Sequence, residues 1–171
     1  MKLFKLTDGQ GCTMGPTQWG EGVKHSVAAD LATAEPELCS NAVIHVYKYL
    51  ELGLIMNPLH ANFRLDGKGL RIWEAEGDVV VESWDKVGCR ELTTIKELPV
   101  PEWYWNSTLK SYVIGLVCGW GCREVGVPWV DYLYSNPGTL RELHRAGIPA
   151  EQLQSYAERA VAEVMRERHL Y

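Results

Sequence analysis

The hydrophobic pattern of the chain changes at Pro99–Pro101, and this change constrains the fold more than any other feature of the sequence. Before it, short runs rich in β-branched residues are separated by turn residues, which is typical of strands. After it, apolar residues recur at spacings of three and four, which is typical of amphipathic helices. The sequence therefore predicts an α+β fold, with an antiparallel or mixed sheet in the N-terminal half and packed helices in the C-terminal half.

We assign residues 1–100 to a β-rich domain and residues 101–171 to a helical region that packs on it; the alternative is that both form one single domain. Residues 2–7 alternate between basic and apolar side chains, which predicts a strand. Residues 9–40 show no sustained period and contain several glycines and prolines, so we predict a long loop there. A loop of this length inside a compact domain is usually functional or mobile.

Two further strand segments, 70–76 and 78–82, are separated by Gly77. We interpret this glycine as a bulge or bend within the sheet rather than a full turn. Residues 49–56 are apolar enough for a short core helix. We expect Asn57-Pro58 to stop this helix, because the residue before a proline is pushed out of the α region.

The C-terminal region is predicted to contain helices over 107–118, 128–134, 139–147 and 149–168. Gly119 and Gly121 weaken any continuation of the first of these helices, so we interpret Cys118 and Cys122 as packing residues rather than as a reactive pair. The apolar residues of the last helix form one stripe, which we expect to dock on the β half or on a partner chain. They are Leu153, Tyr156, Ala157, Ala160, Val161, Val164 and Met165.

Charge and composition exclude several classes of protein. The net charge is −5, and neither half has the basic excess that binding to a phosphate backbone requires, so we expect no nucleic-acid partner. The longest apolar stretches are far shorter than the roughly 20 residues needed to cross a bilayer, so we expect no membrane partner and no exported protein of the usual kind. The five cysteines, an odd number without CxxC spacing, indicate reduced thiols.

Several segments of the first hundred residues together match one known family. They are Met1–Asp8, Thr17–Val23 with His25, Leu38-Cys39, Ile44–Tyr47, Asn57–Phe63, Leu70–Gly77 and Lys86–Ile95. In these segments and their order the chain resembles an uncharacterised domain family that is common in tailed bacteriophages and prophages. The resemblance implies a phage-encoded accessory protein that acts in the cytoplasm of the bacterial host, in host takeover or anti-defence. The resemblance implies no particular activity, and the cofactor stays unknown.

Glu74 and Glu76 lie two residues apart on a predicted strand, so both carboxylates should share one face of the sheet. When two carboxyl groups lie close together, the pKa of one of them is raised. A general acid/base pair needs one carboxyl group with a raised pKa. The Glu-x-Glu pattern is similar to the acidic motif of arginine-directed ADP-ribosyltransferases. In that analogy Glu76 holds a ribose hydroxyl and Glu74 activates the acceptor, Lys5 faces the dinucleotide phosphates, and His45 or Tyr47 lines the nicotinamide pocket. An exposed polar strand face is the alternative interpretation.

Polar groups on two predicted loops form a second set of candidates. Asn57, His60 and Asn62 supply hydrogen-bond donors and acceptors on a proline-started loop, which could recognise a base or a ribose; a plain turn is the alternative. Trp19 and Glu21 lie beside two glycines, so a planar ligand could stack on the indole while the carboxylate accepts from it. A lid over the core is the alternative for this second loop.

The remaining candidates are histidines and one thiol. His25, His45 and His60 could converge at one end of the sheet, but no two of them have the spacing of metal ligands, and we assign no metal site. Arg90 could lower the pKa of the neighbouring Cys89 thiol. A buried, inert thiol is the simpler interpretation of Cys89.

These observations leave three functions open. The first is an accessory protein that binds, and so sequesters, a small nucleotide-like ligand, or that binds a host protein. The alternative is a nucleotide-processing enzyme of the ADP-ribosyltransferase-like type that uses Glu74 and Glu76, and the sequence does not decide whether the chain is an enzyme. The third is a structural module that forms a homo-oligomer through its C-terminal helix. The candidate ligand-binding residues are Lys5, Trp19, Glu21, His25, His45, Tyr47, Asn57, His60 and Asn62.

Overall fold

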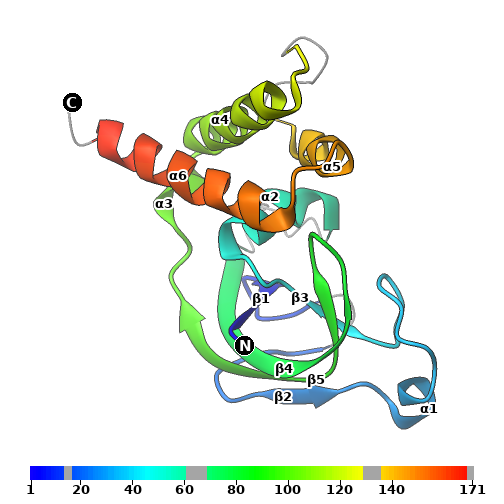
Figure 1. Cartoon of the computed structure of the whole chain (residues 1–171). Helices are drawn as coiled ribbons and strands as arrows, with labels where there is room; N and C mark the ends of the chain where they lie inside the picture. The colour runs from blue at the N-terminus through cyan, green and yellow to red at the C-terminus, as the bar shows by residue number, and fades with distance from the viewer. Residues whose placement is uncertain (14–16, 61–68, 129–135, 169–171) are drawn as a thin grey trace. The chain divides into compact units, whose positions relative to one another are not determined.

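The computed structural model describes residues 1–13, 17–60, 69–128 and 136–168. Strands occupy the N-terminal half and helices the C-terminal half, which confirms the predicted α+β class (Figure 1). The chain divides into two compact units. Unit 1 comprises Met1–Gly53 and Ala61–Val100, and unit 2 comprises Leu54–His60 and Pro101–Tyr171. No helix in the described ranges is both long and apolar enough to cross a membrane.

Unit 1 contains a five-stranded antiparallel sheet. Its strands are β1 (Leu3–Asp8), β2 (Lys24–Ser26), β3 (Ile44–Val46), β4 (Leu70–Glu82) and β5 (Val87–Leu98). Strand β4 pairs with β1 on one side and with β5 on the other. Strand β5 pairs with β3 along its first residues and with β2 along its middle.

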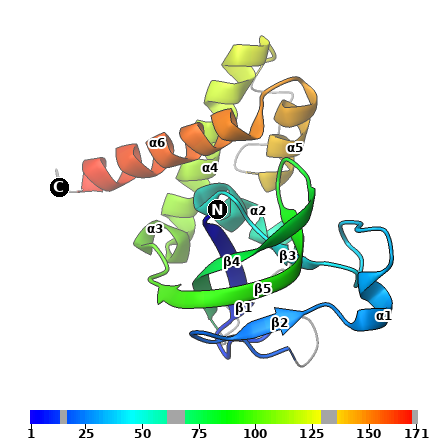
Figure 2. The same cartoon turned by 60° about the horizontal axis from the view of Figure 1, so that its bottom comes forward.

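The sheet closes on itself immediately after β3. Phe4 and Tyr47 exchange two backbone hydrogen bonds, with N···O distances of 2.8 and 2.9 Å. Strands β1, β4, β5 and β3 therefore form a closed ring of antiparallel pairs, a small barrel around which the long strands β4 and β5 curve (Figure 2). The core of this barrel consists of Leu3, Trp19, Val46, Ala75, Val87, Cys89 and Leu92.

Gly77 marks an irregularity within β4, as the sequence predicted. The strand continues through this position, and the register with β5 shifts between Gly77 and Val79. A Cβ atom at Gly77 would lie 2.6 Å from the backbone oxygen of Glu91, which is closer than real Cβ atoms approach a backbone. The glycine lets the two strands come together where they bend, so the bulge interpretation is confirmed.

The predicted loop over residues 9–40 is more structured than expected, since it contains β2 and the short helix α1 (Ala29–Ala32). The Arg90 guanidinium holds its second half in place. Arg90 donates to the carbonyl oxygens of Leu31 at 3.0 Å and Ala42 at 2.7 Å, and also to that of Ala34. Three carbonyl groups of an irregular segment are thus satisfied by one side chain that β5 positions.

Helix α2 (Leu50–His60) does not stop at Asn57, so that expectation was wrong. Pro58 lacks an N–H and removes one helical hydrogen bond, but the helix ends only two residues later. The preceding residues of α2, from Leu52 to Asn57, are buried. The free energy of this burial outweighs the local cost of the proline.

Unit 2 contains α3 (Glu102–Trp105), α4 (Ser107–Val125), α5 (Pro137–Arg145) and α6 (Ala150–Arg168). Helix α4 runs through Gly119 and Gly121, which corrects the predicted end near Cys118. A Cβ at Gly121 would lie 2.5 Å from Cδ1 of Leu143, so this glycine lets α5 approach α4 closely. Helix α5 begins two residues before the predicted start, because the Asn136 side chain caps it by accepting from Gly138 N at 2.8 Å. The predicted helix 128–134 lies, apart from Pro128, outside the described residues.

The apolar stripe of α6 docks within unit 2, so the expectation that it covers the β half or a partner chain was wrong. Leu153, Ala157, Ala160 and Val164 are buried, and α6 packs on α4, α3 and α5. Alanines at two of these positions allow the helices to come close, and the neighbouring helices supply the apolar surface that the stripe needs. The opposite face of α6 is exposed.

Candidate functional site

Lys5 is the most unusual side chain of unit 1. Strand alternation places Leu3, Lys5 and Thr7 on the inner face of β1, and Lys5 is only 7% exposed. Its Nζ donates to the backbone oxygen of His45 at 2.8 Å and lies 5.1 Å from the ring centroid of Trp19. Burial lowers the pKa of Lys5 from 10.5 to about 8, because the interior disfavours the charged form. Within the described residues no carboxylate pairs with this ammonium.

Trp19 forms one wall of this site from inside the barrel. The indole is 2% exposed, and its Nε1 lies 3.3 Å from Oγ1 of Thr13. The His25 ring meets it edge to face with centroids 4.6 Å apart, and His25 Nε2 lies 2.8 Å from the carbonyl oxygen of Gln18. Trp19 is therefore a core residue, and the open stacking face that the sequence suggested is not present.

His45 connects the Lys5 site to the irregular segment before β3. Its Nε2 accepts a hydrogen bond from the backbone N–H of Cys39 at 2.8 Å, so the imidazole is neutral with its proton on Nδ1. Cys39 has a positive φ of 68°, and its exposed Sγ accepts from Lys86 Nζ at 3.0 Å. The bond to His45 fixes this unusual backbone conformation.

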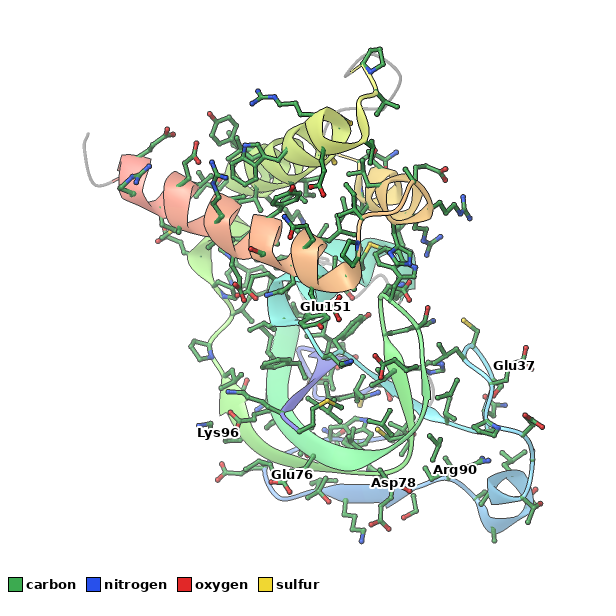
Figure 3. The ribbon with its side chains drawn as sticks, viewed as in Figure 1. Glu37, Glu76, Asp78, Arg90, Lys96 and Glu151 are labelled. Atoms are coloured by element: carbon green, nitrogen blue, oxygen red, sulfur yellow. The ribbon has the colours of Figure 1, made fainter. Side chains whose placement is uncertain are left out.

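Cys89 lies on the inner face of β5 and is buried. Burial, followed by the charge of Asp78, raises the pKa of its thiol to about 11. This confirms the buried-thiol interpretation of Cys89. Arg90 does not lower this pKa, because consecutive strand residues point to opposite faces and the Arg90 guanidinium is directed to the α1 segment (Figure 3). The thiol is protonated at neutral pH and is a packing residue.

The Glu74 carboxylate contacts two lysines. Glu74 Oε2 lies 2.9 Å from Lys2 Nζ and 3.5 Å from Lys96 Nζ, and the hydrogen bond from Lys2 lowers the pKa of Glu74. Glu76 is exposed on β4, where it lies opposite Thr93 of β5 and two residues before Asp78 (Figure 3). The raised pKa expected for a general acid is thus not found at Glu74.

The other predicted ligand residues are spread over the molecule. Asn57 is 1% exposed in the unit 2 part of α2 and donates from Nδ2 to the Tyr104 hydroxyl at 2.9 Å, so it is a structural amide. His60 ends α2, and Asn62 lies outside the described residues. Glu21 is exposed in the turn before β2.

The structure brings together the side chains of three predicted ligand residues in unit 1: Lys5, Trp19 and His25. His45 contributes only its backbone oxygen to Lys5, and the Tyr47 ring packs against Gly53 of α2. Among the described residues there is no group of three His, Cys, Asp or Glu side chains that could hold a metal ion. Sequence reasoning missed the roles of Arg90, Cys39 and Lys86. Their contacts join segments 47 to 59 residues apart, so no local spacing could have indicated them.

No family model, no curated protein and no solved structure matches the chain.

Proposed function

We propose that the protein is a phage-encoded accessory protein that acts inside the bacterial host cell and binds a small nucleotide-like ligand without transforming it. The observation that carries the proposal is the buried ammonium of Lys5, which has one hydrogen-bond acceptor and no carboxylate partner among the described residues. The resemblance of the first hundred residues to a phage and prophage domain family supports the location and the accessory role.

The energetic argument starts from the cost of burying a charge. An ammonium removed from water loses its hydration, and unless an anion compensates it, the folded state is destabilised. The lowered pKa of Lys5 is the titration signature of this cost. Groups with strongly perturbed pKa values and no structural partner are enriched at functional sites. A phosphate or pyrophosphate group would supply the missing negative charge.

The surroundings of Lys5 fit a nucleotide better than a simple anion. The Trp19 ring centroid lies 5.1 Å from Lys5 Nζ, and the His25 ring packs edge to face against Trp19. Aromatic side chains of this kind are common in nucleotide sites, but Trp19 is packed in the barrel core and has to move before a base can stack on it. The described residues hold no complete acid/base or nucleophilic constellation around Lys5, because Cys89 is a protonated thiol and the nearest predicted acid, Glu74, is paired with Lys2. This favours binding and sequestration over turnover.

The other functions considered from the sequence stay predictions. The ADP-ribosyltransferase-like alternative would need Glu74 and Glu76 as catalytic carboxylates, and no contact of either residue favours it. Binding of a host protein in place of a nucleotide is an outcome of the experiment below. Self-association through the C-terminal helix also stays a prediction.

The proposal is tested by thermal unfolding in the presence of ADP-ribose, NAD, AMP or pyrophosphate. A ligand that binds only the folded chain raises the unfolding midpoint. We expect at least one nucleotide to raise the midpoint of the wild-type protein and to leave that of Lys5→Met unchanged. Lys24→Met is the matched control, because Lys24 is an exposed lysine of the same unit that pairs with Glu91.

Mass spectrometry of small molecules released on denaturation distinguishes binding from turnover. The wild-type protein and Glu76→Gln should release the same nucleotide after purification from a bacterial host, and Lys5→Met should release none. An equal midpoint shift in Lys5→Met would contradict the assignment of the site. If neither experiment finds a nucleotide with the wild-type protein, the ligand is not a nucleotide, and the host-protein alternative takes its place.

A further inference from the structure

Cys39 and Lys86 form a thiol–amine pair within unit 1. Lys86 Nζ lies 3.0 Å from Cys39 Sγ, although the two residues are 47 positions apart in the sequence. The Cys39 side chain is exposed. The other four thiols are buried or partly buried: Cys12, Cys89, Cys118 and Cys122. An oxidant dissolved in water therefore has better access to the Cys39 sulfur than to any other thiol of the chain.

The pairing of β3 with β5 holds both members of the thiol–amine pair in place. Lys86 directly precedes Val87, the first residue of β5, which pairs with Val46 of β3. On the other side, the Cys39 N–H donates to Nε2 of His45, the residue before Val46, at 2.8 Å. All of these residues belong to unit 1. The contact between sulfur and nitrogen is therefore built into the sheet of one unit.

An oxidised sulfur at this position would have a nitrogen nucleophile beside it. Hydrogen peroxide oxidises a cysteine sulfur by two electrons: the thiol becomes a sulfenic acid, –SOH, and the other peroxide oxygen is reduced to water. A sulfenic acid condenses with a nitrogen atom to form a sulfenamide. Lys86 Nζ, 3.0 Å from Sγ, is a nitrogen nucleophile once its ammonium has given one proton to the solvent.

We propose that oxidation of Cys39 by hydrogen peroxide leads to a reversible sulfenamide bond between Cys39 Sγ and Lys86 Nζ. The Lys86 nitrogen attacks the sulfur of the sulfenic acid, the S–N bond forms and the S–O bond breaks. The nitrogen releases its second proton to the departing hydroxide, which leaves as water. Excess thiol reverses the reaction, because one thiol attacks the sulfur and releases the amine, and a second reduces the mixed disulfide.

The sulfenamide would act as a reversible device that responds to peroxide. It would join the irregular segment before β3 to the hairpin between β4 and β5. In the reduced chain, the Arg90 guanidinium already holds part of this segment through the carbonyl oxygens of Leu31 and Ala42. The bond would also protect Cys39 from further oxidation to sulfinic acid, which thiols do not reverse. The inference is independent of the Lys5 site.

The test is mass spectrometry of the full chain after treatment with hydrogen peroxide in the absence of a reducing agent. We expect the intact mass to fall by about 2 Da, because the bond removes two hydrogen atoms, whereas a sulfenic acid would add about 16 Da. Proteolysis should then give one crosslinked peptide pair that contains Cys39 and Lys86. Dithiothreitol should restore the original mass.

Three variants separate the proposed bond from other oxidation products. Lys86→Arg keeps the positive charge but replaces the amine by a weakly nucleophilic guanidinium, so its Cys39 should stop at the sulfenic acid and be trapped by dimedone. Cys39→Ser should form neither product. Cys12→Ser is the matched control, since it removes the other thiol that is not fully buried. It should form the crosslink like the wild-type protein.

The proposal is overturned if peroxide takes wild-type Cys39 only to sulfenic or sulfinic acid, or leaves it unchanged, while Lys86 stays unmodified. A decrease of about 2 Da that persists in Lys86→Arg also overturns it, because the sulfur would then be bonded to another group. A disulfide between two copies of the chain, or a crosslink that retains an oxygen atom, would equally contradict the proposed bond.

Discussion

The two units of the molecule bury polar groups in different ways. In unit 2, Asn57 is buried and donates from Nδ2 to the Tyr104 hydroxyl at 2.9 Å, and both groups are neutral. In unit 1, Lys5 is buried as an ammonium with a single carbonyl acceptor. Neutral hydrogen-bonded pairs stabilise a core or leave it unchanged, whereas a buried charge without a counter-charge destabilises it.

The unpaired charge in unit 1 indicates where to look for a ligand site. The helical unit can be understood as a packed core with capped helices. The barrel contains a charge that packing alone does not require, since methionine fills a similar volume without the cost of desolvation. The Lys5 ammonium is buried without a carboxylate partner among the described residues, and this is why we place the proposed ligand site in unit 1.

The largest expected effect is a stabilisation by Lys5→Met. Burial lowers the pKa of Lys5 from 10.5 to about 8. Each pKa unit corresponds to about 1.4 kcal/mol, and part of the gain is offset by the lost contact with Trp19, so the free energy of unfolding at pH 7 should rise by about 1–3 kcal/mol. Urea unfolding measures this change, and Lys24→Met should leave the free energy of unfolding nearly unchanged. A marked destabilisation by Lys5→Met would contradict the claim that the buried Lys5 charge destabilises unit 1.

The same substitution should alter the pH dependence of stability. The pKa of Lys5 is lower in the folded chain than in the unfolded one, so the unfolded chain binds more protons between about pH 8 and 10.5. Below about pH 8 the buried Lys5 charge lowers the free energy of unfolding by its full amount. This loss of stability disappears as the pH rises from about 8 to 10.5. The stability difference between Lys5→Met and wild type should therefore shrink toward pH 10.5. The raised pKa of Cys89 lowers stability at alkaline pH in both proteins, and this pKa rises further in Lys5→Met because the Lys5 charge that lowers it is gone.

A smaller effect is expected for Arg90→Lys, which tests how unit 1 holds its irregular segment. Lysine cannot reproduce three hydrogen bonds to the carbonyls of Leu31, Ala34 and Ala42, and we expect a loss of about 2 kcal/mol. Hydrogen exchange measured by mass spectrometry should become faster between residues 28 and 42 and stay unchanged in α4 and α6. Unchanged exchange in the 28–42 segment would show that Arg90 does not hold it.

Gly121→Ala tests the packing of unit 2. Alanine favours a helix over glycine by about 1 kcal/mol, so the helix alone would gain stability. The new Cβ would meet Leu143 at 2.5 Å and Ile148 at 3.2 Å, and we expect a net loss of about 1–2 kcal/mol. Chemical unfolding gives the sign directly. Adding Leu143→Ala to Gly121→Ala should cost less than Leu143→Ala costs alone, because the new methyl group then fills vacated space.

The smallest expected effect is that of Asn106→Ala at the start of α4. The Asn106 side chain accepts from the backbone N–H groups of Thr108 and Leu109 at 3.0 and 3.1 Å. Removing this cap should lower the free energy of unfolding by about 1 kcal/mol, and Asn106→Asp should keep it. If both variants are equally destabilised in urea, the cap contributes nothing and only the side-chain volume matters.

Sequence patterns were sufficient where one local rule decided the structure. The alternation of residues 2–7 predicted β1, and Gly77 predicted the bulge in β4. They were insufficient where burial outweighed a local rule, as in α2 at Pro58 and α4 at Gly121.

The position of the candidate site depended on contacts that no local pattern contains. Alternation shows that Lys5 shares a face with Leu3 and Thr7, but not that this face lies inside a closed barrel. Closure depends on the pairing of Phe4 with Tyr47, 43 residues further along the chain. Trp19 was predicted equally as a stacking platform or a lid, and only the packing of the barrel shows that it is a core residue.

The cost of burying the Lys5 ammonium is tested most directly by an NMR titration of the Lys5 side chain, with its Cε and Hε signals assigned from their absence in Lys5→Met. We expect a midpoint near pH 8 in the free protein. We also expect the midpoint to rise when a bound nucleotide places negative charge beside the ammonium. A midpoint near 10.5 in the free protein would mean that Lys5 is hydrated or paired and that its burial costs nothing, and the Lys5 site would then lose its physical basis.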